Sequence, residues 1–228
     1  MELLKELKPF KKKSLSSFLD ARSMFNYACR HVSLFRSEEL KETWVGIKAF
    51  VGEDIDEVDF MYEYCFCVYV SGFKAVIVAK KYDELLRAHN IVDDKDYYIP
   101  IEEDNLLTDL SSVLSVFNNE KKAEAIQKTR RLILDTGWED FSAEYVQDRD
   151  PVKLQELFYI GPALSCHLAR NLGNVDIVKP DVHLNRLAER FAFESAQDMC
   201  DALASPPAIP AAYVDLILWM ASVDNGTL

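Results

Sequence analysis

The chain has few of the features that mark several large protein classes. Only seven of its 228 residues are glycine, and it holds no internal repeat, P-loop, zinc motif or convincing Ser/His/Asp pattern. No apolar run is long enough to span a bilayer. The first residues, MELLKELKPFKKK, lack the apolar block of a secretory signal. We therefore expect a soluble protein of the cytoplasm that does not contact a membrane.

Cysteine is also too sparse to form a framework. The chain has five cysteines, which are Cys29, Cys65, Cys67, Cys166 and Cys200. An odd count without regular spacing predicts free thiols. Cys65 and Cys67 lie two residues apart and would point to different sides of a helix. We therefore expect no metal site on cysteine.

Positive charge is in short supply as well. The chain has 26 basic and 38 acidic residues, which gives a net charge of −12. This acidity weakens non-specific attraction to nucleic acid, because such affinity rests largely on phosphate neutralisation. A nucleic-acid-binding function would therefore need positive charge concentrated on one face.

What the chain does have is apolar content and helical periodicity. Apolar residues make up 49% of the sequence, enough for a packed core. Their spacing predicts an all-α protein. The expected helices are 56–70, 73–89, 119–134, 138–145, 151–158 and about 211–222. The run 75–79 is also compatible with a short strand, and the acidic stretch 93–104 is expected to be a loop.

The most informative stretch is 157–191, LFYIGPALSCHLARNLGNVDIVKPDVHLNRLAERF. A helix ends at a tight turn around Gly161, a second helix follows at once, and Asp181 opens a third. Glycine at 161 would allow a sharp turn, and the free amides of the next helix could hold a phosphate. An ordinary hairpin of two packed helices and a plain helix cap at Asp181 remain alternatives.

This order of elements resembles the helix-hairpin-helix-GPD superfamily of DNA glycosylases. The resemblance implies an all-α, two-lobed fold with the active-site cleft between the lobes. It covers residues 55–228, with the hairpin at about 151–173. Residues 1–54 match no known element, and we expect them to form a helical extension that packs on this core.

The resemblance also implies roles for individual residues. Asp181 is the expected catalytic carboxylate. The hairpin residues expected to bind DNA are Tyr159, Ile160, Gly161 and Ala163. Phe73 is the candidate wedge that fills the gap left by an extruded base, and the other candidate DNA contacts are Lys74, His183 and Arg186. The candidates for the base pocket are Tyr69, Trp138 and Trp219.

Two departures from the family pattern bear on the chemistry. Ala163 stands where bifunctional members have a nucleophilic lysine, which implies a monofunctional enzyme; Lys153 and Lys179 lie off that register and stay open as lyase candidates. Tyr159 stands where the family usually has the first hairpin glycine. That departure bears on an alkali-metal ion that the hairpin carbonyls could bind. No iron–sulfur cluster is expected, because only Cys200 lies near the C-terminal end.

The expected function is hydrolysis of the N-glycosidic bond of a damaged or modified base flipped out of double-stranded DNA, by a monomer that needs no cofactor. Such a protein would be nucleoid-associated if bacterial. Alkylated purines are the usual targets of lysine-lacking relatives. Three alternatives stay open: a non-catalytic module that binds DNA or a repair partner, an enzyme that excises hypermodified bases from phage DNA, and an unrelated helical interaction protein.

Overall fold

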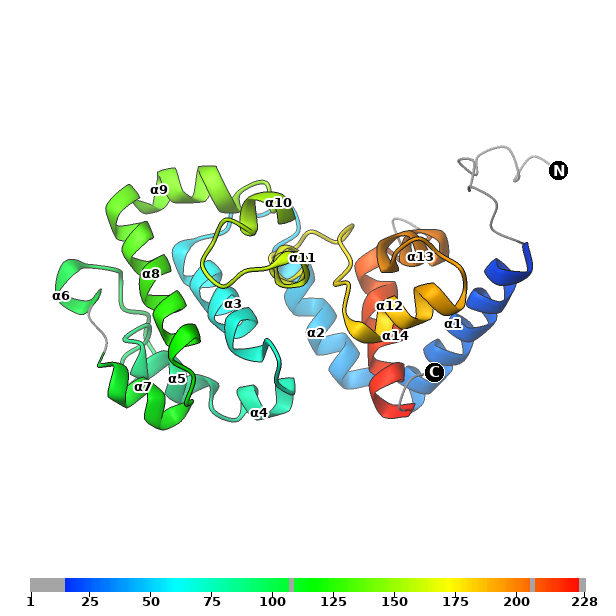
Figure 1. Ribbon diagram of the computed structural model, residues 1–228, viewed down its shortest axis with the longest axis horizontal. Helices are drawn as coiled ribbons and strands as arrows, with labels where there is room; N and C mark the ends of the chain where they lie inside the picture. Colours follow the sequence, from blue (N-terminus) through cyan, green and yellow to red (C-terminus); the bar gives the residue numbers. More distant parts are fainter. Residues whose placement is uncertain (1–14, 107–108, 206–207, 226–228) are drawn as a thin grey trace. The chain divides into compact units, whose positions relative to one another are not determined.

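Helices build the whole described part of the chain. The computed structural model describes residues 15–106, 109–205 and 208–225, and every named element in these ranges is helical (Figure 1). The prediction of an all-α protein is confirmed. Extended pairing in these ranges is limited to two isolated bridges, Val92 with Tyr98 and Ser205 with Ile209.

The helices follow one another with short connections. In the first half of the chain they are α1 (Leu15–Phe35), α2 (Ser37–Ala49), α3 (Glu57–Val70), α4 (Ala75–Ala79), α5 (Tyr82–Ala88), α6 (Glu103–Leu106) and α7 (Leu110–Val116). In the second half they are α8 (Glu120–Thr136), α9 (Trp138–Phe141), the π-helix η1 (Ser142–Val146), α10 (Pro151–Leu154), α11 (Pro162–Asn171), α12 (Val182–Arg190), α13 (Ala196–Leu203) and α14 (Ala211–Asn225).

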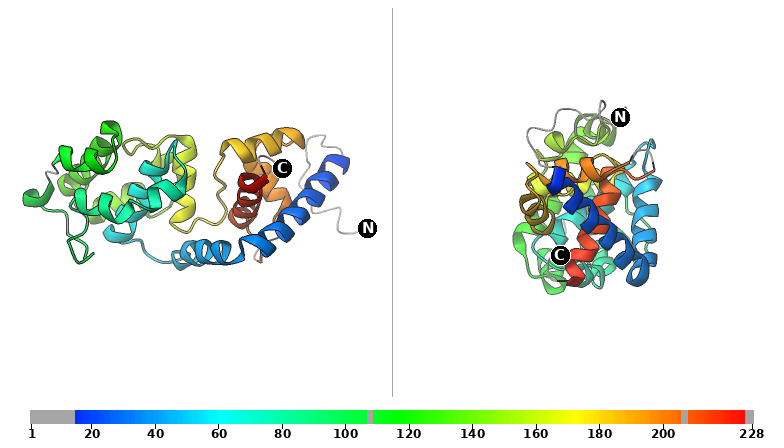
Figure 2. Two further views of the ribbon diagram at one scale, coloured as in Figure 1. Left: turned by 90° about the horizontal axis from the view of Figure 1, so that it is seen from below. Right: turned by 90° about the vertical axis from the view of Figure 1, so that its right-hand side faces the viewer.

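Contacts divide the chain into two compact units. One unit runs from Gly46 to Asn174, and the other combines the chain up to Val45 with the chain from Val175 onward. This division differs from the expected boundary at residue 54. The reason is that α1 packs along α14, near the other end of the sequence, so that first and last helices share one unit (Figures 1 and 2).

Helix α3 is the centre of the unit Gly46–Asn174. It begins at its cap Asp56, whose side chain accepts a hydrogen bond from the Asp59 amide at 2.8 Å. It packs against α4, α8 and α11. Its buried side chains are Phe60, Met61, Tyr64, Cys65, Cys67, Val68, Tyr69 and Val70. A helix that is apolar on nearly every face belongs inside a domain, which explains its central place.

The hydroxyl of Tyr64 joins three segments of this unit. Tyr64 is completely buried on α3. Its hydroxyl accepts a hydrogen bond from Thr129 Oγ1 of α8 at 2.7 Å and donates to the carbonyl of Phe158 at 2.7 Å. Burial raises the pKa of Tyr64, so the hydroxyl keeps its proton. The loop before α11 is thereby attached to the central helix.

Two of the expected helices are shorter than predicted. The segment 73–89 is broken into α4 and α5 at Lys80 and Lys81, where the Lys81 amide donates to the Val78 carbonyl, three residues back. The segment 151–158 is helical only as α10, Pro151–Leu154. Beyond Leu154 the chain continues in tighter turns, in which the amides of Glu156, Leu157 and Ile160 donate to carbonyls three residues back, and Tyr64 donates to the Phe158 carbonyl. The segment 138–145 forms α9 and η1.

Helix α14 is the centre of the other unit. It packs against α1, α12 and α13, and its inner face includes Val214, Leu218 and Ala221, each completely buried. Arg22 of α1 donates to the carbonyl of Leu203, at the end of α13, at 2.7 Å. The predicted apolar helix near the C-terminus is therefore confirmed, and it organises the helices that follow residue 175 (Figure 2).

The bonds of Tyr64 predict a stability effect. Tyr64→Phe leaves the Thr129 hydroxyl and the Phe158 carbonyl without their partner, and this should lower the free energy of unfolding by about 1–3 kcal/mol in urea titrations. Tyr62→Phe on the same helix is the control. The Tyr62 hydroxyl has no partner among the described residues, so its removal should change stability by less than about 0.5 kcal/mol. Equal effects of the two variants would contradict the role of Tyr64.

Candidate functional site

The hairpin turn lies between α10 and α11, which pack against each other. Tyr159 has a φ of 67°, in the left-handed region, whereas Gly161 has φ −93° and ψ −179°. The expectation that Gly161 provides the sharp turn is therefore wrong, because any residue can adopt its backbone conformation. The left-handed residue is Tyr159, at the position where the family usually has glycine. The turn accepts the cost of a side chain there, about 1 kcal/mol or more.

The first amides of α11 have no acceptor. Among the residues that the structure describes, none accepts a hydrogen bond from the amides of Gly161, Ala163 or Leu164, and Pro162 has no N–H. A Cβ built on Gly161 would meet nothing within 4 Å. Free amides and the helix dipole together favour an anion in this open space.

The other hairpin residues hold the turn in place. Ile160 is 5% exposed, and its amide donates to the Leu157 carbonyl at 3.2 Å. The side chain of Ile160 therefore packs in the core and is not available to contact DNA. Phe158 and Tyr159 are 40% and 39% exposed, respectively, so two aromatic rings flank the free amides.

The candidate wedge Phe73 follows α3 in a short loop. Gly72 has a φ of 73°, a conformation that glycine favours, and Phe73 is 46% exposed. The Phe73 ring packs edge-on against Phe117, with centroids 4.8 Å apart. Lys74 is exposed, and its ammonium has no partner among the described residues. Both predicted contacts in this loop are thus accessible to a ligand.

A buried lysine lies between this loop and the hairpin. Lys122 of α8 is 1% exposed, and its Nζ donates to the carbonyls of Tyr69 at 2.8 Å and Ser71 at 2.6 Å. The same Nζ lies 4.7 Å from the centroid of the Phe73 ring and 5.7 Å from that of Tyr159. Lys122 therefore brings together two segments that the sequence predicted to bind DNA.

Asp181 lies in the other unit, at the start of α12. It is the N-cap residue, and its Oδ1 accepts hydrogen bonds from the amides of His183 at 2.9 Å and Leu184 at 3.0 Å. Its Oδ2 accepts none from any residue that the structure describes. The side chain is half-buried. One oxygen is thereby fixed by the helix and the second is available.

The loop before Asp181 is attached to its own unit by side chains and backbone. The amide of Lys179 donates to Oδ2 of Asp215 at 2.9 Å, and Asp215 is 1% exposed on α14. The amide of Val178 donates to Oε1 of Gln197 at 2.9 Å. At the loop's first residue, the carbonyl of Val175 accepts from Ala212 at 3.0 Å. These bonds fix the position from which α12 starts.

The other predicted residues of α12 lie close to Asp181 in sequence. Nδ1 of His183 is buried and has no partner among the described residues. Arg186 is exposed, and no described carboxylate pairs with it. Val182 is 53% exposed beside the cap. This end of α12 therefore carries an uncompensated cation and an apolar surface next to the free carboxylate oxygen.

The three predicted pocket aromatics have different surroundings. Tyr69 is completely buried, and its hydroxyl lies 2.6 Å from Nε2 of His89, so its ring offers no face to a base. Trp138 is half-buried against Phe60, with centroids 5.8 Å apart. Trp219 belongs to the other unit, where the Arg36 guanidinium lies 5.9 Å from its ring. Tyr69 is therefore a core residue, and its position does not fit stacking on a base.

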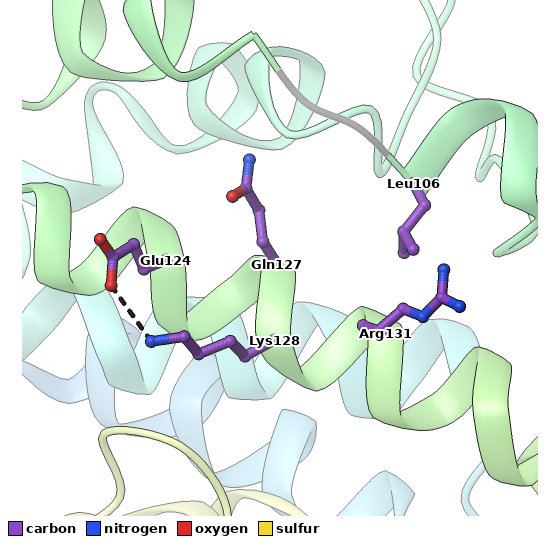
Figure 3. Close-up of a pocket in the computed structure, with 5 residues that line it drawn as sticks. All are labelled: Leu106, Glu124, Gln127, Lys128 and Arg131. Atoms are coloured by element: carbon purple, nitrogen blue, oxygen red, sulfur yellow. Dashed lines mark hydrogen bonds and ion pairs between the residues drawn. The ribbon is translucent and has the colours of Figure 1, made fainter.

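The basic residues of α8 are compensated within the protein. Lys128 pairs with Glu124 at 3.1 Å, and Arg131 pairs with Glu103 at 2.9 Å. These side chains border a pocket of about 270 Å³ between α6 and α8 (Figure 3). The pocket is lined by Leu106, Glu124, Gln127, Lys128 and Arg131. None of them is a predicted site residue, and the paired charges leave this face without a cluster of free cations.

The described residues were also compared with the patterns of disulfides, metal sites and membrane-spanning helices. The five cysteines form no disulfide in the structure. Residues 15–106, 109–205 and 208–225 contain no group of three or more His, Cys, Asp or Glu side chains placed to hold a metal ion. In the same ranges no helix has the length and apolar character required to cross a bilayer.

Comparisons with known proteins add no family. No protein-family model, no curated protein and no solved structure matches the chain. The resemblance to helix-hairpin-helix glycosylases therefore rests on the residues of the chain themselves.

Three residues that the sequence did not single out support the predicted ones. Tyr64 anchors the hairpin, Asp215 anchors the loop before Asp181, and Lys122 connects the wedge loop with the hairpin. A sequence signal existed only for Lys122. It lies one helical turn before Ile126 on the apolar stripe of its helix, and that stripe faces the core.

The left-handed conformation of Tyr159 predicts that glycine is more stabilising than alanine at this position, the reverse of their order within a helix. Tyr159→Gly and Tyr159→Ala both remove the ring, but only alanine keeps a Cβ. The glycine variant should therefore be the more stable by about 1 kcal/mol in urea unfolding. At Lys128, an exposed position within α8, alanine should exceed glycine by about 1 kcal/mol. The same order at both positions would show that Tyr159 is not left-handed in solution.

The burial of Lys122 predicts a pH dependence of stability. Burial lowers the pKa of Lys122 from 10.5 to about 8. Between these values the unfolded chain binds more protons at this lysine, so the folded state gains stability from this group as pH rises. The free energy of unfolding of the wild type, minus that of Lys122→Met, should increase from pH 8 to 10.5 and stay level from pH 6 to 7. Lys121→Met, at an exposed position, is the control for loss of a lysine. A flat difference for Lys122→Met would contradict the lowered pKa.

Proposed function

We propose that this chain is a monofunctional DNA glycosylase, which hydrolyses the N-glycosidic bond of a damaged or modified base flipped out of duplex DNA and leaves an abasic site. The observation that carries the proposal is the state of Asp181. Two amides of α12 fix its Oδ1, while Oδ2 has no donor among the described residues. A carboxylate held in this way can act on a ligand without losing its place.

The chemistry requires one carboxylate close to the sugar. The bond from C1′ to the base breaks, and the base leaves with the electron pair. Positive charge then develops on the deoxyribose, and a nearby carboxylate stabilises it. Oδ2 of Asp181 would orient the attacking water and accept its proton as the new C1′–O bond forms. The target must leave the stacked duplex first, because the bond is otherwise shielded.

The hairpin supports a DNA substrate. The free amides of Gly161, Ala163 and Leu164 would bind a phosphate without the help of a basic side chain. This matters in a chain with a net charge of −12. Exposed Lys74 and Arg186, which have no carboxylate partner among the described residues, would add contacts to phosphates.

The lysines favour hydrolysis over strand cleavage. A lysine nucleophile must lose its proton before it attacks the sugar. Lys153 is paired with Glu144 at 2.6 Å, and this bond raises the pKa of Lys153. Ala163 occupies the position where the resemblance expects the nucleophile. A carboxylate and a water molecule suffice for hydrolysis, and the alkali-metal ion at the hairpin stays a prediction.

The setting of the reaction follows from the same proposal. The substrate is double-stranded DNA, the enzyme acts as a monomer, and in a bacterial cell it would be associated with the nucleoid. Alkylated purines are the first bases to test, followed by oxidised, deaminated and hypermodified bases. The two-lobed arrangement of the resembling family stays a prediction for this chain.

Asp181→Asn is the decisive variant. Asparagine caps helices as well as aspartate does, so the fold should persist with a stability change under about 1 kcal/mol. Release of base from a panel of modified duplexes, with abasic sites revealed by alkali, should fall by about 100-fold or more, because the carboxylate is lost. DNA binding, measured by fluorescence anisotropy, should persist.

Asp56→Asn is the matched control. Asp56 caps α3 through one carboxylate oxygen, as Asp181 caps α12, and has no proposed role in the reaction. This variant should release base at the wild-type rate. DNA binding without base release from any duplex would replace the enzyme with a binding module. No DNA binding at low salt would overturn both. Strand breaks without alkali would refute the monofunctional assignment and direct attention to Lys179.

A further inference from the structure

Lys122 is a buried cation without a carboxylate partner. It is 1% exposed, and no described acidic side chain pairs with it. Burying an unpaired charge is costly unless hydrogen bonds or other polar contacts replace water. Here the replacements are the carbonyls of Tyr69 and Ser71 and several aromatic rings. A methionine could pack in this position without a charge. The presence of a lysine therefore needs an explanation other than packing.

The aromatic rings around Lys122 come from four separate segments. Measured from Nζ to the ring centroid, Phe73 of the wedge loop lies at 4.7 Å, and Phe117 at the end of α7 at 5.7 Å. Tyr159 of the hairpin lies at 5.7 Å, and Tyr69 of α3 at 6.0 Å. A cation within about 6 Å of a ring centroid is attracted to the ring, more strongly where water is excluded. One ammonium thus holds segments from residues 69 to 159.

We propose that Lys122 is a positioning residue, which fixes the Phe73 loop and the Tyr159 hairpin relative to each other so that both engage duplex DNA as one surface. The proposal rests on the proposed function, because it assumes that Phe73 enters the duplex and that the hairpin amides hold a phosphate. The binding free energies of the inserted Phe73 and of the phosphate at the hairpin add only if the distance between the two contacts is fixed.

The alternative is that Lys122 only caps α3. A cation at the C-terminus of a helix satisfies its last carbonyls and favours the dipole. Capping accounts for the bonds to Tyr69 and Ser71, but it does not require contact with Tyr159, which lies in a different segment. The two roles are distinguished by whether a change at Lys122 affects the hairpin as well as the wedge loop.

The surface next to Phe73 fits the same role. Val76 and Ile77 of α4 are 59% and 45% exposed, so Phe73 belongs to a larger exposed apolar strip. Lys74 and Lys80 are exposed beside it, and the segment 73–81 contains no acidic residue. An apolar strip bordered by cations suits insertion between base pairs with phosphates on either side. Insertion requires that Phe73 be held in a fixed position, and the contact of its ring with Lys122 holds it.

The test uses a probe that does not depend on the target base. Duplexes carry 2-aminopurine opposite a tetrahydrofuran abasic-site analogue, and intact duplexes serve for comparison. The wild type should prefer the abasic duplex, and the aminopurine fluorescence should change as Phe73 enters the gap. In Lys122→Met this preference should fall about tenfold and the fluorescence change should disappear, while affinity for intact duplex stays within about twofold. Lys121→Met should match the wild type.

Hydrogen exchange of the free protein tests the coupling without DNA. In Lys122→Met, exchange should rise together at residues 72–74 and 159–161. If this variant does not fold, Tyr159→Leu serves instead, since it removes one ring contact and leaves the bonds of Lys122 to α3. It should raise exchange at 72–74, far away in sequence.

The outcomes separate the two proposals. Unchanged duplex preference in a folded Lys122→Met, or faster exchange at 72–74 alone, would overturn the positioning role. If the wild type binds neither duplex, the proposed function fails. Coupling is then decided by exchange alone: it stands if both loops respond and falls if only one does.

Discussion

Many side chains of this protein are positioned by the need to pair the free backbone amides and carbonyls at helix ends. Every helix leaves amides free at its start and carbonyls free at its end, and buried ones must find partners. Asp181 satisfies amides of α12, and Lys122 satisfies carbonyls at the end of α3. In the loop before α11, Tyr64 satisfies the carbonyl of Phe158 in the same way. The start of α11 differs from the starts of α3, α8, α12 and α13, because the described residues provide it with no side-chain acceptor; the short helices α4, α5 and α9 also lack one. The candidate anion site thus lies at the start of a long helix whose first amides have no acceptor among the described residues.

This distribution explains how an acidic chain can offer a site for an anion. Most basic side chains of α8 are used inside the protein: Arg130 is buried on backbone carbonyls, and Lys128 and Arg131 form ion pairs. These side chains therefore add little positive electrostatic potential at the protein surface. Backbone amides act at close range, whereas the field of carboxylates farther away on the surface is screened by salt. A phosphate would therefore be held by the direction of a few N–H groups, with a small number of unpaired cations beside them.

The sequence predicted the parts of the fold that depend on local pattern. The helices 56–70 and 119–134, the helix that opens at Asp181 and the apolar C-terminal helix all follow from periodicity and helix-end chemistry. What it could not predict depends on tertiary contacts. The left-handed Tyr159 is tolerated because neighbouring segments hold the turn, and no local rule favours a tyrosine there. Nothing in the sequence separates Tyr69 from an exposed aromatic residue, yet tertiary contacts bury its side chain completely.

Lys122 illustrates the limit most clearly. Lysine is almost never fully buried, so its place on an apolar stripe looks like an interruption of that stripe. Only the approach of two loops from elsewhere in the chain turns this place into a polar site.

The capping role of Asp181 does not compete with a catalytic one. Asparagine and serine cap helices about as well as aspartate, so capping alone does not call for a carboxylate. The support behind it is also larger than a cap requires. Asp215, almost fully buried on α14, holds the Lys179 amide, and Gln197 holds that of Val178. Together these bonds fix the backbone just before Asp181. Fixing the backbone on both sides of Asp181 leaves only its second oxygen to respond to a ligand, and such restraint lowers the entropy that a reacting group must lose.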